Sequence, residues 1–178
     1  MKRSDFLKIA GIGTGTVAMT PFAALKAKSL KPEHMTPMIV RKGDGKKVDV
    51  LGDKMTFKLT GKDTGGLFTL IEENNAPGVG IPPHVHDNED EIFRVIEGEL
   101  EVTVGGDTTI LKAGDTAFAP RGVPHTWRVV GNGPVKVDLS IFPAGLEHMF
   151  EELGALPAGP TDMEKVVEIC GRYNVRFV

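Results

Sequence analysis

Three histidines and one glutamate have the residue types and the spacing of a metal site. These residues are His84, His86, Glu91 and His125. His84 and His86 are two residues apart, so both imidazoles of an extended chain point to the same face. Neutral imidazole suits Fe, Ni, Cu and Zn, and a carboxylate adds charge and hardness. Judged by spacing alone, the set fits a metal site and a group of unrelated surface or core histidines equally well.

Short runs of alternating apolar and polar residues surround these four residues and predict half-buried strands. The expected strands cover residues 55–60, 67–72, 91–96, 100–104, 108–111, 116–119, 126–130 and 135–141. Glycine-rich turns separate them. Many short strands at this spacing predict an all-β sandwich or barrel. By strand parity, Phe93 should face the interior together with Glu91, and Trp127 together with His125.

The period changes after the last strand. Met163, Val166, Val167 and Cys170 recur at helical spacing. Thr161 and Glu164 form a capping box for this helix. A shorter helix is expected near residues 146–153. Cys170 is interpreted as a small core hydrophobe.

The first 28 residues have the composition of an export signal. Lys2 and Arg3 precede a mildly apolar, glycine-rich stretch over residues 9–19, and small residues follow. Residues 3–8 resemble the twin-arginine signal, whose core reads Arg-Arg-x-Phe-Leu-Lys, with Ser4 in place of the second arginine. The segment therefore predicts export to the bacterial periplasm. A cytoplasmic protein with an amphipathic N-terminal helix is the alternative, and residues 29–47 are expected to form a linker or an N-terminal arm.

Composition excludes several classes of protein. The 178 residues carry a formal net charge of −3, and no basic cluster points to nucleic acid. The single cysteine excludes an internal disulfide and a cysteine-rich zinc site. No run approaches the roughly 18 apolar residues of a membrane-spanning helix, so no membrane association is expected after removal of the signal.

The four candidate ligands lie in two motifs that resemble those of the cupin superfamily. The first motif reads Gly-x5-His-x-His-x3,4-Glu-x6-Gly, and this chain matches it with Gly78, His84, His86, Glu91 and Gly98. The second reads Gly-x5-Pro-x-Gly-x2-His-x3-Asn, and this chain matches it with Gly114, Pro120, Gly122 and His125, with Val129 in place of the final Asn. The motifs cover residues 78–129.

This resemblance implies a cupin jelly-roll β-barrel over residues 48–145 and short C-terminal helices over residues 146–178. It also implies one divalent first-row metal ion (Fe, Ni, Mn, Cu or Zn) held by His84, His86, Glu91 and His125. Asp90 has the shorter spacing that the first motif allows and is the alternative to Glu91 in this role, but strand parity and the six residues before Gly98 favour Glu91. Residues 87–90 are expected to form a solvated acidic loop, and Gly98 and Gly114 are interpreted as turn residues.

The chain further resembles single-domain bacterial cupins that are similar to quercetin dioxygenases. This implies an oxygenase acting on a small aromatic or enolic molecule such as a flavonol, with O₂ as the second substrate. Glu91 would be both ligand and base. Met55, Phe57, Phe93 and Trp127 would line an apolar substrate pocket. The alternatives are a non-catalytic cupin that binds a sugar or a small acid, and a metal-dependent isomerase. Ile92 and Ile96 on an outer strand face predict a homodimer.

Overall fold

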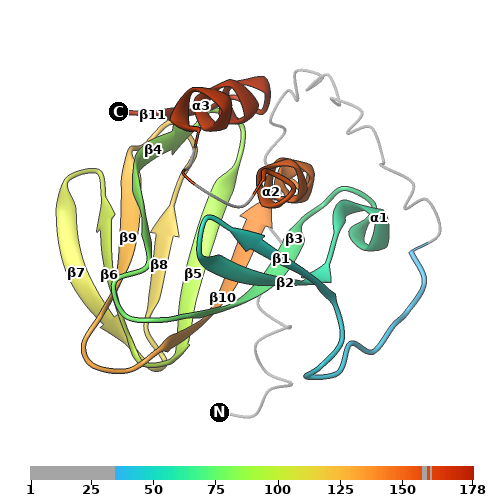
Figure 1. Cartoon of the computed structure of the whole chain (residues 1–178). Helices are drawn as coiled ribbons and strands as arrows, with labels where there is room; N and C mark the ends of the chain where they lie inside the picture. The colour runs from blue at the N-terminus through green and yellow to red at the C-terminus, as the bar shows by residue number, and fades with distance from the viewer. Residues whose placement is uncertain (1–34, 158–159, 161) are drawn as a thin grey trace, which may run out of the picture. The chain divides into compact units, whose positions relative to one another are not determined.

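Figure 1 shows the computed structural model, which describes residues 35–157, 160 and 162–178. The export signal predicted for residues 1–28 lies outside the described residues, and so does Thr161, the predicted helix cap. No helix among the described residues is long and apolar enough to cross a membrane.

Eleven strands within this part of the chain form two antiparallel sheets. The first sheet has the order β1(Lys46–Val50), β2(Asp53–Leu59), β3(Thr69–Asn75), β10(Val135–Phe142), β5(Asp90–Glu97), β8(Thr116–Ala119). The second has the order β11(Val175–Phe177), β4(Gly80–His86), β9(His125–Val130), β6(Glu99–Val104), β7(Asp107–Lys112). This architecture confirms the all-β jelly roll expected from the sequence.

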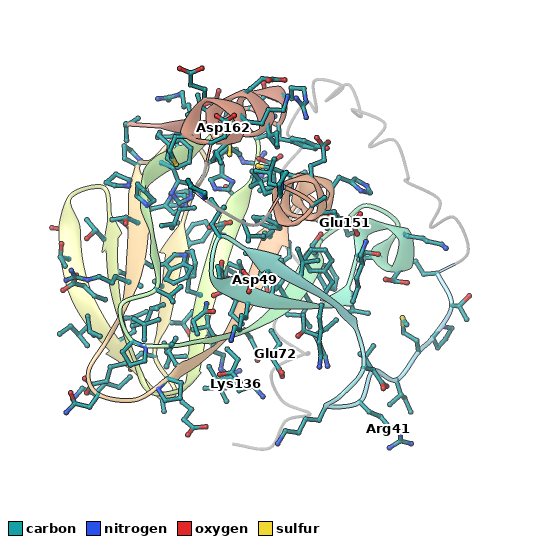
Figure 2. The ribbon with its side chains drawn as sticks, in the orientation of Figure 1. Arg41, Asp49, Glu72, Lys136, Glu151 and Asp162 are labelled. Atoms are coloured by element: carbon teal, nitrogen blue, oxygen red, sulfur yellow. The ribbon has the colours of Figure 1, made fainter. Side chains whose placement is uncertain are left out.

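The alternating sequences fold as their pattern predicts. All four inward side chains of β10 (Val135, Val137, Leu139 and Ile141) are buried between the two sheets. On the outer face of the same sheet, Glu72 of β3 lies 2.8 Å from Lys136 of β10 (Figure 2). Half-buried strands of this kind give each sheet one apolar face, and packing those two faces together forms the core.

Three strands have no alternating signal, and sequence analysis does not predict them. β4 contains the Pro82–Pro83 pair, which interrupts the alternation and removes two backbone donors. β1 lies partly in the segment expected to be a linker or arm. β11 comes directly after a helix, and its Val175 pairs with His86 of β4. Two of these strands, β4 and β11, lie side by side in the second sheet.

Three helices accompany the sheets in the part of the chain that the structure describes: α1(Gly61–Thr64), α2(Leu146–Gly154) and α3(Met163–Arg172). α2 contacts β1, and α3 contacts β11 and α2, so the two longer helices cover one end of the sheets (Figure 1). Asp162 caps α3, because its carboxylate accepts a hydrogen bond from the Lys165 N–H at 3.0 Å. Cys170 is 3% exposed, which confirms its predicted place in the core.

The outward side chains of β5 bear on the predicted homodimer. Ile92 is half-buried and pairs in register with Phe118 of β8, while Ile96 and Phe118 are exposed. These positions agree with an apolar outer face, and the oligomeric state stays a prediction.

Gly98 joins β5 to β6 with φ +83°. A Cβ at this position would lie 2.9 Å from the Val135 Cα and closer still to the Pro134 carbonyl oxygen. We expect Gly98→Ala to lower the free energy of unfolding by about 2 kcal/mol or more, since left-handed backbone costs roughly 1–2 kcal/mol and the close approach adds to it. Urea unfolding measures this. Gly106→Ala is the matched control, because its φ is +101° and its Cβ would meet nothing within 4 Å. Equal losses in both variants would contradict the role of the close approach.

Candidate metal centre

The two sheets bring the four predicted ligands together. His84 and His86 lie on β4, and His125 lies opposite His84 on the neighbouring strand β9. Glu91 comes from β5 in the other sheet and points into the same interior. Each of the four offers one ligand atom, and these atoms lie within 4.8 Å of one another. All four side chains are buried, with at most 3% exposure.

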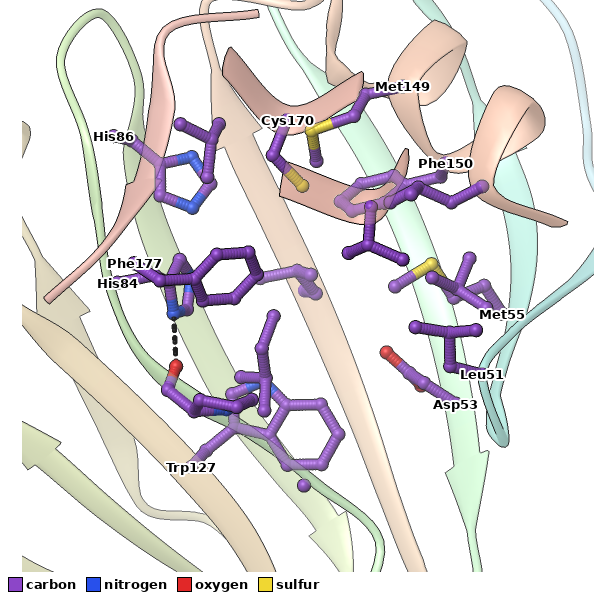
Figure 3. A pocket seen from close by; sticks show the side chains of 18 of the residues that line it. Leu51, Asp53, Met55, His84, His86, Trp127, Met149, Phe150, Cys170 and Phe177 are labelled. Atoms are coloured by element: carbon purple, nitrogen blue, oxygen red, sulfur yellow. Dashed lines mark hydrogen bonds between the residues drawn. The ribbon is translucent and has the colours of Figure 1, made fainter. Parts of the chain in front are cut away.

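Backbone carbonyl groups fix the orientation of two imidazoles. The Nδ1 of His84 lies 3.0 Å from the Pro82 carbonyl oxygen (Figure 3), and the Nδ1 of His125 lies 3.1 Å from the Val123 carbonyl oxygen. A carbonyl oxygen only accepts hydrogen bonds, so each Nδ1 must carry the proton and donate it. This leaves the Nε2 of both rings as the atom that can ligate a metal. Such a hydrogen bond on the far nitrogen is the usual support of a ligating histidine.

His86 is the residue that most clearly fits a metal. Both of its ring nitrogens are buried and have no hydrogen-bond partner within the described part of the chain. Its Nε2 lies 3.8 Å from a Glu91 oxygen, and its Nδ1 lies 3.9 Å from a Glu89 oxygen, both too long for hydrogen bonds. A buried imidazole without partners is costly. A metal ion between the four donors would satisfy it, so the residues present fit a divalent first-row ion.

Glu91 supplies the negative charge of the site. Burial raises the pKa of its carboxyl, but the three surrounding imidazoles outweigh this and lower the pKa to about 2. Its closest contact is with the Nε2 of His125, at 3.1 Å. The carboxylate is therefore ionised over the whole physiological range. One negative charge among three imidazoles is a donor set that attracts a cation.

The three imidazoles differ in their affinity for protons. Burial lowers the pKa of His84 to about 4, and it also lowers the pKa of His86. Burial has the same tendency at His125, but the hydrogen bond and the charge of Glu91 outweigh it and raise the pKa above its ordinary value. Two rings are thus neutral and ready to ligate at neutral pH. His125 donates to both Val123 and Glu91, which requires a proton on each nitrogen.

Metal affinity is expected to fall about tenfold per pH unit below the pKa of His125, because its Nε2 must lose one proton before it ligates. That pKa lies above the ordinary value of 6.5, so the loss of affinity begins near neutral pH and continues as the solution becomes more acidic. Metal titrations between about pH 5 and pH 8 measure this dependence. An affinity that does not change over this range would contradict ligation by His125.

The structure distinguishes two neighbouring carboxyl groups from the four candidate ligands. Asp90 does not compete with Glu91, because its carboxylate accepts hydrogen bonds from the Arg121 Nε at 3.0 Å and Nη2 at 2.8 Å. Glu89 is only 8% exposed. The expectation of a solvated acidic loop is therefore wrong for this residue. The loop folds its side chain towards His86, and burial raises the pKa of Glu89 to about 7.

A cavity of about 110 Å³ adjoins the four donors, and His84, His86 and Glu91 line part of it. Met55 and Trp127 line it too, as the sequence predicts. Phe57 and Phe93 do not line it. Phe57 packs near Phe150, with ring centroids 6.4 Å apart, and Phe93 is fully buried near His125. Strand parity places both rings inside the barrel, but it does not say how far along the barrel the cavity lies.

Sequence analysis missed two groups of residues in this cavity. The C-terminal elements close it with Met149 and Phe150 of α2, Cys170 of α3 and Phe177 of β11 (Figure 3). Asp53 of β2 and Glu73 of β3 form a polar part of its wall. The signal for Glu73 was present, because it shares strand parity with the buried Ile71. The closure by α2, α3 and β11 has no comparable local signal.

Comparison with known proteins agrees with this architecture. A family model described as "Cupin domain" matches residues 72–142, a stretch that contains all four candidate ligands. The solved structure of KdgF from Halomonas sp. superimposes with a TM-score of 0.56 at 21% identity, covering 64% of this chain and 99% of that one. At this level of identity, the likeness shows the fold alone.

Two curated relatives extend the comparison. The quercetin 2,3-dioxygenase of Bacillus subtilis (strain 168) is 28% identical over 123 residues, which cover 69% of this chain and 36% of that protein. The probable germin-like protein subfamily 2 member 5 of Arabidopsis thaliana is 36% identical over 109 residues, which cover 56% of this chain and 50% of that protein. The chain thus spans between about a third and a half of the length of these relatives.

Proposed function

We propose that this chain, whose residues 72–142 match the cupin domain, is a metal-dependent oxygenase of the dioxygenase type. Its substrate is a small aromatic or enolic molecule such as a flavonol, and O₂ is the second substrate. The observation that carries the proposal is the buried set of three imidazoles and one carboxylate at the edge of a largely apolar cavity. The similarity to a quercetin 2,3-dioxygenase supports the same substrate class.

The donor set defines what a bound metal would contribute. Such an ion would act as a Lewis acid towards a substrate oxygen and lower the pKa of its hydroxyl group. The Nδ1 atoms of His84 and His125 each donate to a carbonyl oxygen, so the Nε2 of His84 is free for ligation, and the Nε2 of His125 becomes free once it loses the proton it donates to Glu91. These hydrogen bonds hold the rings in place, so the ligand atoms are positioned before the metal arrives.

Glu91 is the residue proposed to accept the substrate proton. Its Oε2 contacts the His125 Nε2, while its Oε1 has no hydrogen-bond partner among the described residues and lies 3.8 Å from the His86 Nε2. Because the surrounding imidazoles lower the pKa of Glu91, it is a weak base. Only a substrate whose hydroxyl group is already acidic transfers a proton to such a group. This favours enolic and phenolic substrates over simple alcohols.

The apolar wall suits a planar ring. Trp127 of β9, Leu139 of β10 and Phe150 of α2 contribute large apolar surfaces to the cavity. These side chains exclude water from the space beside the four donors. Exclusion of water strengthens the electrostatic interactions within the site and protects a reactive substrate anion from protonation.

Two measurements on the purified protein test the proposal. Elemental analysis should find near-stoichiometric Fe, Ni, Mn or Cu, and an oxygen electrode should record O₂ consumption with a flavonol or catechol. Glu91→Gln should abolish this consumption, whereas Glu97→Gln, on the exposed end of the same strand, should leave it intact. Stoichiometric zinc without O₂ consumption would favour the isomerase. A folded protein that holds no metal would favour the non-catalytic binding cupin.

A further inference from the structure

The cavity has a second polar region, on the side away from the histidines. Figure 3 shows Asp53 across the cavity from His84 and His86, with apolar side chains between them. Glu73 lines the same region from the neighbouring strand, because β3 pairs with β2 in a register that places Glu73 opposite Met55. We call Asp53 and Glu73 the distal pair. Neither residue belongs to the cupin motifs.

Asp53 is held in place by its neighbours. The Nδ2 of Asn75 donates to its Oδ1 at 2.6 Å. The Oδ1 of Asn75 in turn accepts a hydrogen bond from the Lys54 N–H at 2.8 Å. Asn75 is fully buried, so this arrangement fixes the Asp53 carboxyl at the cavity wall. Its second oxygen has no hydrogen bond to any described residue and is left for another partner.

Glu73 has no partner among the described residues. It is 1% exposed, and neither carboxyl oxygen has a hydrogen bond there. A carboxyl group that serves only packing would be replaced at lower cost by an apolar side chain, because burial without a hydrogen bond is unfavourable. Buried unpaired polar groups are rare enough in folded proteins that each requires an explanation. A hydrogen bond to a ligand group in the cavity explains why the Glu73 carboxyl has no partner in the protein itself.

We propose that the distal pair is the second anchor of the pocket, where Glu73 donates to an uncharged hydroxyl or carbonyl oxygen of a small ligand, and Asp53 accepts from the ligand group where it is a hydroxyl. The other end of that ligand reaches the four metal-binding residues, and this part of the inference rests on the proposed function. The ligand class is therefore a bifunctional, uncharged molecule with oxygen groups at both ends of an apolar body. Glu73 is a specificity-determining residue in this arrangement.

The charges around the distal pair support this class. Burial, with the charges of Asp53 and Glu91, raises the pKa of Glu73 well above its ordinary value, which favours the protonated form that can donate a hydrogen bond. Burial also raises the pKa of Asp53 to about 7, against the hydrogen bond from Asn75, with further contributions from Asp49 and Glu91. The other titratable groups that line the cavity are His84, His86 and Cys170.

An anionic ligand group would meet several carboxyl groups at this wall. No lysine or arginine among the described residues lines the cavity to compensate such a charge. Bringing a carboxylate into this buried, acidic region would cost both desolvation and repulsion. The distal pair therefore discriminates between uncharged and anionic molecules of the same size.

Calorimetric titration of the metal-loaded protein with three catechols tests this inference. The probes are 3,4-dihydroxybenzaldehyde, 4-methylcatechol and 3,4-dihydroxybenzoate, which share the metal-binding end and differ in an uncharged carbonyl, a methyl and a carboxylate. We expect the aldehyde to bind about tenfold more tightly than the methyl compound, the benefit of one well-placed hydrogen bond. The benzoate should bind most weakly of the three.

Variants of Glu73 test whether its side chain causes the preference for the aldehyde over the methyl compound. Glu73→Gln keeps a donor of the same length and should retain the preference for the aldehyde. Glu73→Met removes the donor at similar volume and should abolish it. Glu72→Gln, on the outer face of the same strand, is the matched control and should leave all three affinities unchanged.

The outcomes separate this inference from the proposed function. Equal affinities of the wild-type protein for the aldehyde and the methyl compound, tighter binding of the benzoate, or no binding of any probe would overturn the distal anchor. A preference that survives in Glu73→Met would overturn the role of Glu73. If the preference is present but no probe or flavonol consumes O₂, the anchor stands and the oxygenase proposal fails.

Discussion

Loss of bound metal is the expected result of Glu91→Gln and of His86→Ala. Each change removes one of four donors whose ligand atoms lie within 4.8 Å of one another. Losing a residue that only supports a ligand costs about 10–100-fold in metal affinity, so losing a ligand should cost at least about 100-fold. The effect should be large for Glu91 in particular, because it is the one residue of the set that carries a negative charge at neutral pH.

Elemental analysis of each purified variant measures this effect, and an unfolding transition checks that the variant is folded. His148→Ala is the matched control for His86→Ala, because His148 is an exposed histidine on α2 outside the cluster. His86→Ala also removes a buried imidazole whose two ring nitrogens have no hydrogen-bond partner among the described residues. Without metal, removal of this unpaired imidazole should raise the free energy of unfolding, and the cavity left by the side chain should lower it. The metal-free variant is therefore expected to be about as stable as the metal-free wild-type protein. Full metal occupancy in both variants would show that the site is assigned to the wrong residues.

Glu147→Ala is expected to produce the largest loss of stability. Glu147 lies in the first turn of α2 and is 3% exposed. Its carboxylate accepts hydrogen bonds from the Gly61 N–H at 2.8 Å, the Thr69 hydroxyl at 2.6 Å and the Gly145 N–H at 2.7 Å. Hydrogen bonds to charged groups contribute about 1.5–3 kcal/mol each, and the variant leaves their donors unpaired, so we expect a loss of about 3 kcal/mol or more.

Urea unfolding of this variant measures the loss, with Glu151→Ala on the same helix as the matched control. Glu151 lies 2.8 Å from Lys46 in an exposed ion pair, and such pairs contribute about 0–1 kcal/mol. Burial raises the pKa of Glu147, but its hydrogen bonds outweigh this and lower it. The contribution of Glu147 is therefore present above the ordinary glutamate value and lost as the pH falls through the lowered pKa. Similar losses in both variants would contradict the role of Glu147 in joining α1, β3 and α2.

The alternating strands and the four candidate ligands could be predicted from the sequence. Alternation is a local property, and it places Ile71, Phe93 and Val137 inside the barrel in agreement with their burial. The ligand positions were predicted because the spacing of the two histidine-containing motifs is itself local within each motif. The same parity rule applied to β3 would have placed Glu73 in the interior as well, next to Ile71.

Only the tertiary structure shows which residues of different strands and helices lie close to one another. Glu91 lies in one sheet and the three histidines in the other, so only the packing of the two sheets determines that their ligand atoms meet. The same packing excludes Phe57 and Phe93 from the cavity wall. The packing also places the Asp90 carboxylate against Arg121, 31 positions later in the chain, and buries the side chain of Glu89.

The sequence by itself determined which side chains of the alternating strands face the interior of the barrel and which residue types could hold a metal. The tertiary structure decided where the cavity lies, which helices close it and which carboxyl groups are buried in its wall. The physical reason is that periodicity reports the face of one element, whereas a cavity is enclosed by elements distant in sequence. Burial by those elements, rather than any local pattern, raises the pKa of Glu73 and sets it apart from the solvent-facing Glu72 beside it.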